Sequence, residues 1–111
     1  MGRLRQSSSA EAMGRHASLL AALRRAVFES HARTDPPTRK SAASGGFLAE
    51  PARSYVAKVR DQSYRITDGD IEVLATAGLS EDEIFEITVA AALGAALRSL
   101  DAGLQALRQE A

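Results

Sequence analysis

The long run of helix-forming residues from Ser80 to Leu107 constrains this chain more than any other feature. Its sequence, SEDEIFEITVAAALGAALRSLDAGLQAL, contains no proline, and its only glycines are Gly94 and Gly103. Ser80 followed by Glu83 matches the capping box that begins many helices. At a rise of about 1.5 Å per residue, the helix would be roughly 42 Å long, longer than a small domain is wide. The other elements must therefore be arranged around it.

This helix is apolar around most of its circumference, and such a helix is normally buried on all sides. The rest of the chain is predicted to form only four short helices, which offer too little surface to cover the long one. The alanines and Gly94 of the long helix allow another backbone to approach closely. An alanine-rich core helix is one interpretation. We favour a core helix that also contacts a copy of itself, because a small domain gains stability by sharing its core. The predicted contact residues are Phe85, Val89, Ala92, Leu93, Gly94, Ala96 and Leu100.

Four shorter helices are predicted upstream of residue 80. Apolar residues recur at steps of three and four over residues 10–30, which predicts a first helix. Asp35, followed by two prolines, is a typical cap for a second helix. Pro51 begins a third helix, and Thr67 caps a fourth. No stretch alternates with the period of two that strands require. The sequence thus predicts an all-α bundle of about five helices.

Length and charge favour one small domain that binds neither nucleic acid nor membranes. The chain has 111 residues, and we expect a flexible tail over residues 1–9 and a single helical domain over residues 10–111. Fourteen basic and fourteen acidic residues cancel, so no overall field attracts nucleic acid or anionic lipid. The apolar run over residues 84–97 is shorter than the about 20 residues of a membrane span. The N-terminus also lacks the apolar core of a secretory signal. We therefore expect a cytoplasmic protein without a membrane or nucleic-acid partner.

The chain contains no cysteine, which excludes disulfides and thiolate catalysis. Its two histidines, His16 and His31, have no partner at a spacing typical of metal ligands. The sequence therefore predicts neither a metal site nor a cofactor, and it does not identify a small-molecule ligand.

Glu86 is the one charged residue in the apolar run of the long helix. It could act as a general base or proton relay with a raised pKa. Alternatively, it is a structural carboxylate, satisfied by an arginine or by the solvated rim of the bundle. The structural interpretation is favoured because no second catalytic group accompanies it.

Residues 55–104 carry a pattern of motifs across two helices and their joint. A Tyr-x-x-Lys-Val sequence begins at Tyr55, and a Thr-Asp-x-Asp-Ile cap begins at Thr67. The turn Ala-Gly-Leu-Ser ends at Ser80, and a Glu-Ile-x-Glu sequence then opens the alanine-rich helix. This pattern resembles the carboxymuconolactone decarboxylase and alkylhydroperoxidase D-like superfamily.

The resemblance implies a helical scaffold without redox chemistry. In redox members, the long helix carries a glutamate, a Cys-x-x-Cys pair and a histidine. By this resemblance the glutamate falls on Glu86, the cysteines on Arg98 and Asp101, and the histidine on Gln105. Without a thiolate, the chain should not reduce hydroperoxides. Members of the superfamily commonly assemble through their helices, which implies a homo-oligomer here.

Three functions remain open at this point. The first is a non-redox, oligomeric structural or binding module of this superfamily. The second is an enzyme of the decarboxylase or lactone-processing type, with Glu86 as acid or base and Arg98 holding a substrate carboxylate. The third is a helical adaptor that binds another protein through the apolar face of the long helix.

Overall fold

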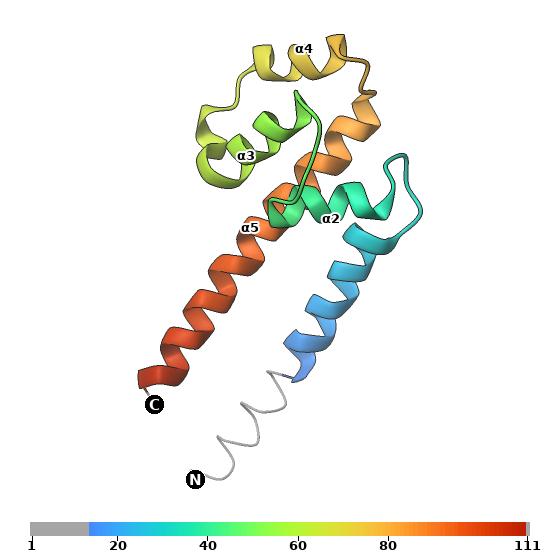
Figure 1. Cartoon of the computed structure of the whole chain (residues 1–111). Helices are drawn as coiled ribbons and strands as arrows, with labels where there is room; N and C mark the ends of the chain where they lie inside the picture. The colour runs from blue at the N-terminus through green and yellow to red at the C-terminus, as the bar shows by residue number, and fades with distance from the viewer. Residues whose placement is uncertain (1–13, 111) are drawn as a thin grey trace, which may run out of the picture.

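The computed structural model describes residues 14–110, and that part of the chain contains helices and no strand. The first helix covers residues 14–24 and continues directly into a π-helical turn, η1 (Arg25–Glu29). The remaining elements are α2 (Pro36–Ser44), α3 (Ala52–Gln62), the short 3₁₀ helix η2 (Ser63–Arg65), α4 (Asp68–Thr76) and α5 (Glu81–Glu110). The predicted all-α class, with five helices and a long C-terminal helix, is confirmed (Figure 1). The predicted tail over residues 1–9 lies outside the described residues.

Three helices begin at the caps that the sequence predicts. The Asp35 carboxylate accepts a hydrogen bond from the Thr38 amide at the start of α2. Thr67 and Asp70 form a reciprocal capping box at the start of α4. At the start of α5, the Glu83 amide donates to Ser80 Oγ over 3.1 Å, while the Ser80 amide donates to the Glu83 carboxylate over 2.9 Å. Each cap satisfies amides that the first helical turn leaves without partners.

The end of the first helix differs from the regular helix predicted to continue to residue 30. Its last turn widens into η1, and Ser30 then adopts an extended conformation. The Ser30 hydroxyl donates back to the Ala26 carbonyl, so it partners one of the carbonyls that the helix end leaves open. Apolar periodicity does not distinguish a π turn from an α turn, because the same residues supply both.

The core lies against the N-terminal half of α5, which α2 and α3 cover (Figure 1). One face of α5 is buried there, and it meets Leu74 from α4 and Val56 from α3. Burial of large aliphatic side chains such as Leu74 and Ile87 contributes about 1.5–3 kcal/mol each. The buried face of α5 consists of Ile84, Ile87, Ala90, Ala91, Gly94 and Leu97.

At Gly94, α5 meets α2 backbone to backbone. A Cβ atom placed on Gly94 would lie 2.2 Å from the Ala43 carbonyl oxygen, closer than any real contact. Gly94 is therefore buried by α2 within the chain, and the close helix approach predicted at this residue occurs inside the molecule.

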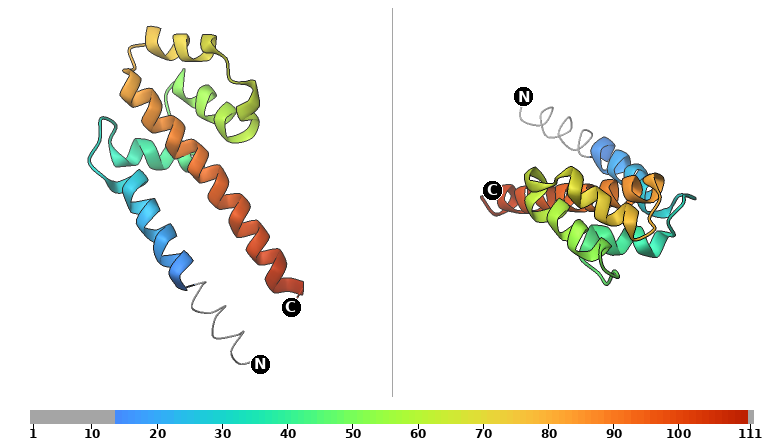
Figure 2. Two further views of the ribbon diagram at one scale, coloured as in Figure 1. Left: turned by 180° about the vertical axis from the view of Figure 1, so that it is seen from behind. Right: turned by 90° about the horizontal axis from the view of Figure 1, so that it is seen from above.

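The molecule is elongated, with principal extents of 61 × 29 × 22 Å. Its radius of gyration is 17.3 Å, compared with about 13 Å for a compact chain of this length. The first helix runs antiparallel to α5, and the C-terminal half of α5 extends beyond the core (Figure 2). This projecting half of α5 is covered on few sides.

The composition of α5 has a second implication. An 18-residue window within Glu81–Gln109 has a mean hydropathy of 1.4, and 28% of that window is buried. By length and composition alone, the helix could cross a membrane. A mostly buried core helix of a soluble protein also meets this criterion.

Candidate functional site

Glu86, the predicted acid or base, anchors the loop between the first helix and α2. Its carboxylate accepts hydrogen bonds from the Thr34 amide and the Thr34 hydroxyl, both over 2.7 Å. It also accepts a third bond from the Arg33 amide over 3.1 Å. Three donors from a segment more than 50 residues away thus surround one carboxylate. The partners are two backbone amides and a threonine hydroxyl, rather than the arginine side chain or solvated rim expected from the sequence.

These contacts decide the protonation state of Glu86. Burial raises the pKa of its carboxyl and is the largest single influence. Hydrogen bonds from Thr34 and Arg33, with the nearby charge of Arg39, together outweigh burial and hold that pKa below its ordinary value of 4.5. Glu86 is therefore ionised at neutral pH, and its oxygens are occupied by donors rather than open to a substrate.

Replacement of Glu86 by Gln is expected to lower the free energy of unfolding by about 1–2 kcal/mol at neutral pH, because one oxygen acceptor is lost. The carboxyl has a lower pKa in the folded state, so its contribution is fully present above about pH 4.5. That contribution is lost as the pH falls through the depressed pKa. The difference in the free energy of unfolding between wild type and Glu86→Gln should therefore shrink in acid.

Urea titrations between neutral pH and a pH of about 3 measure this difference. The matched control is Glu72→Gln, on an exposed position of α4; an equal pH dependence in both variants would contradict the prediction.

Arg39 is a buried charge that sequence reasoning missed. It lies in the middle of α2 and is only 2% exposed. One guanidinium nitrogen donates to the Val27 carbonyl over 2.7 Å and to the Ser30 hydroxyl over 3.3 Å, and the other donates to the Ser30 carbonyl. Arg39 therefore partners carbonyls that the end of the first helix leaves open. The one signal in the sequence is that Arg39, Ala42 and Ala43 share a helix face that is otherwise small and apolar.

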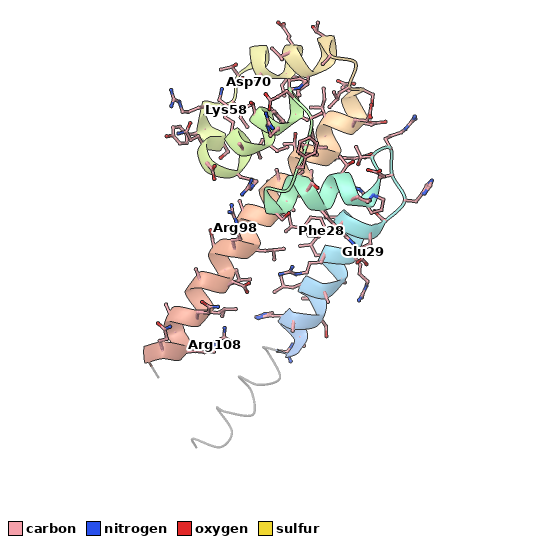
Figure 3. All side chains as sticks on the ribbon, in the orientation of Figure 1. Phe28, Glu29, Lys58, Asp70, Arg98 and Arg108 are labelled. Atoms are coloured by element: carbon pink, nitrogen blue, oxygen red, sulfur yellow. The ribbon has the colours of Figure 1, made fainter. Side chains whose placement is uncertain are left out.

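Arg98 lies in a different place from Glu86. The two residues are twelve positions apart on α5, which separates them by about 18 Å along the helix axis. Arg98 lines a hollow of about 530 Å³ between the first helix, α2 and α5, and Glu86 is not part of its lining. Figure 3 shows Arg98 on α5, with Phe28 and Glu29 on the η1 turn across from it. The structure therefore does not bring the two predicted catalytic residues together.

The predicted contact residues of α5 divide into three groups. Gly94 is buried against α2, whereas Val89 and Leu93 are partly buried. The others are exposed, with Phe85 68% and Leu100 41% exposed. Phe85, Ala92, Ala96 and Leu100 are separated by seven, four and four positions, and so share one face with Val89 and Leu107. We call this face the apolar stripe; it consists of Phe85, Val89, Ala92, Ala96, Leu100 and Leu107.

A second apolar feature, which we call the outer groove, lies beside the stripe. It is a hollow of about 420 Å³ between the first helix and the projecting half of α5. Apart from His16, its walls are apolar. They are formed by His16, Ala17, Leu19, Leu20, Leu100 and Leu104.

Polar side chains of α3 and α4 form pairs with structural roles. Lys58 lies 2.8 Å from the Asp70 carboxylate, and this hydrogen bond, with that of the Thr67 amide, holds the pKa of Asp70 below its ordinary value. Tyr55 and Thr88 share a hydroxyl contact of 2.6 Å, and Thr88 donates to the Ile84 carbonyl. Over residues 14–110, no group of three acidic or histidine side chains is arranged to hold a metal ion. The acidic turn beginning at Thr67 forms the capping box of α4.

Comparison with known proteins adds no relative. The chain matches no family model, no curated protein and no solved structure.

Proposed function

We propose that the chain is a non-redox helical module that assembles with copies of itself, and that it belongs to the superfamily that its sequence resembles. The observation that carries the proposal is the uncovered apolar surface of α5. Leu107 is 67% exposed and Leu100 is 41% exposed, although both lie on the element around which the fold is built. Exposed apolar side chains grouped on one helix face are typical of an interaction site.

A second copy fits this surface better than an unrelated partner. The outer groove lies between the first helix and α5, and an apolar helix packed across it at a shallow angle would cover its walls. The apolar stripe of another α5 is such a helix face. Each copy carries both features, so a two-fold arrangement covers groove and stripe of both copies together. The net charge of zero also means that no net long-range repulsion opposes assembly.

Sedimentation velocity on the purified chain measures the assembly. We expect the wild type to form a defined oligomer at micromolar concentration. The double variant Leu100→Glu/Leu107→Glu is expected to shift to monomer, because it places charges in a surface that assembly would desolvate. The matched control is Ala102→Glu/Gln105→Glu, which adds the same two charges at exposed positions of α5 outside the stripe.

Three results would contradict the proposal. These are a wild type that remains monomeric at high micromolar concentration, an unchanged mass in the Leu100/Leu107 variant, and an equal loss of mass in the control. Stable capture of a different protein by a monomeric wild type would instead favour the adaptor. Binding to phospholipid vesicles by the monomer would favour a membrane role for α5.

The enzyme alternative has less support in the geometry. The Glu86 carboxylate is ionised, engaged by three donors and about 18 Å along α5 from Arg98. A general acid needs a proton at neutral pH, and a base needs an open lone pair near its substrate. Since the chain has no cysteine, thiol-based redox activity is also excluded.

A further inference from the structure

The hollow that contains Arg98, which we call the basic hollow, is separate from the outer groove. It lies nearer the core, where η1 and the end of the first helix, α2 and α5 meet. Its volume of about 530 Å³ lies within the range of small-molecule sites. The outer groove also lies between the first helix and α5, but no residue lines both hollows. The two sites can therefore be tested separately.

The rim of the basic hollow carries an excess of positive charge. Arg24, Arg25, Lys40 and Arg98 line it, against the carboxylates of Glu29 and Asp101, which leaves a net charge of +2. Lys40 is 3.8 Å from Glu29 and is thereby partly neutralised. Arg24, Arg25 and Arg98 make no ion pair within 4 Å and no side-chain hydrogen bond among residues 14–110. Three guanidinium groups are thus available around one hollow.

The floor of the basic hollow is apolar. Phe28 and Leu97 supply large side chains, and Ala43 and Gly94, where α2 and α5 meet, line it beside them. Guanidinium groups bind carboxylates and phosphates through paired N–H donors, and they do so most strongly where water is partly excluded. A positively charged rim around an apolar floor matches a ligand that has an anionic group and an apolar body.

We propose that the basic hollow binds a small organic anion that has an apolar or aromatic body. The anionic group lies between Arg24 and Arg98, and the body lies on Phe28 and Leu97. An inorganic anion alone would leave the apolar floor exposed to water. A neutral apolar molecule would leave the guanidinium groups without a partner.

Two fluorescent probes test this assignment on the full chain. Anilinonaphthalene sulfonate is an aromatic anion, and phenylnaphthylamine has a closely similar ring system without the charge. The double variant Arg24→Gln/Arg98→Gln is expected to weaken binding of the anion about tenfold, the loss expected for a charge-assisted hydrogen bond, and to leave the neutral probe unchanged. The matched control, Arg15→Gln/Arg108→Gln, removes equal charge from exposed positions on the same two helices and should change neither.

Competition with other anions then distinguishes the contribution of the anionic group from that of the apolar body. Octanoate is expected to displace the anionic probe, whereas acetate and inorganic phosphate at equal concentration are not. Raising the ionic strength to about 1 M, where the Debye length is about 3 Å, should weaken the anionic probe alone. Equal loss in both double variants, equal loss of both probes, or displacement by inorganic phosphate as readily as by octanoate would each overturn the proposal. None of these outcomes depends on whether the chain forms an oligomer.

Discussion

Replacement of Gly94 by alanine is expected to destabilise the folded chain by about 3 kcal/mol, although alanine is the better helix former by about 1 kcal/mol. The new Cβ would lie 2.2 Å from the Ala43 carbonyl oxygen and 2.7 Å from the Ala43 carbonyl carbon. These are backbone atoms inside a helix, so they cannot rotate out of the way as a side chain would. Relief requires α2 to move off α5, which opens the core around Ala42 and Leu97.

The matched control for this prediction lies on the same helix. Gly103 has nothing within 4 Å of an added Cβ, so Gly103→Ala should stabilise the chain by about 0.5–1 kcal/mol through helix propensity alone. Denaturant titration of both variants measures the difference in the free energy of unfolding. Equal and favourable effects at the two glycines would show that α2 does not pack on α5 as described.

The second large effect is expected for Arg39→Met, which should cost about 3 kcal/mol. Methionine keeps most of the length and apolar character of the side chain, so the variant removes the charge and the donors with little loss of volume. The carbonyls of Val27 and Ser30 would then lack their partner in a partly buried place. The attractive charge near Glu86 would also be lost.

Lys40→Met is the control for this variant, because it removes the same charge from the next position of α2, where the side chain is 56% exposed. It should change the free energy of unfolding by less than about 1 kcal/mol. Hydrogen exchange adds a local measurement, since Arg39→Met should release the first helix before α2 and α5 open. Exchange that stays uniform along the chain, or two variants of equal stability, would refute the role of Arg39.

The elements that were predicted correctly are those with local causes. The caps at Asp35, Thr67 and Ser80 depend on residues three positions apart, so they are visible in the sequence. The apolar periodicity of α5 is local in the same sense. These local features are sufficient to predict the all-α class and the long C-terminal helix.

The parts that could not be predicted depend on contacts between distant segments. Glu86 meets Thr34 across 52 positions of sequence, and no pattern marks Thr34 as its partner. Arg39 is buried and donates to Val27 and Ser30 at the end of the first helix, twelve and nine positions away. Gly94 carries a signal for close packing, but the sequence does not say whether the neighbour is α2 or another chain. The basic hollow likewise draws its residues from three helices, so its charge pattern exists only after folding.

The central position of α5 has a consequence for biosynthesis. The helices made before it, α2 and α3, bury their apolar residues mainly against α5, which emerges from the ribosome after them. Until residues 84–97 leave the exit tunnel, the nascent segment has no core and remains open to chaperones and proteases. Once those residues are free, Ala42, Val56 and Leu74 can be buried around a single helix. The emergence of residues 84–97 from the tunnel, rather than their translation, thus sets the moment at which the earlier part of the chain becomes protected.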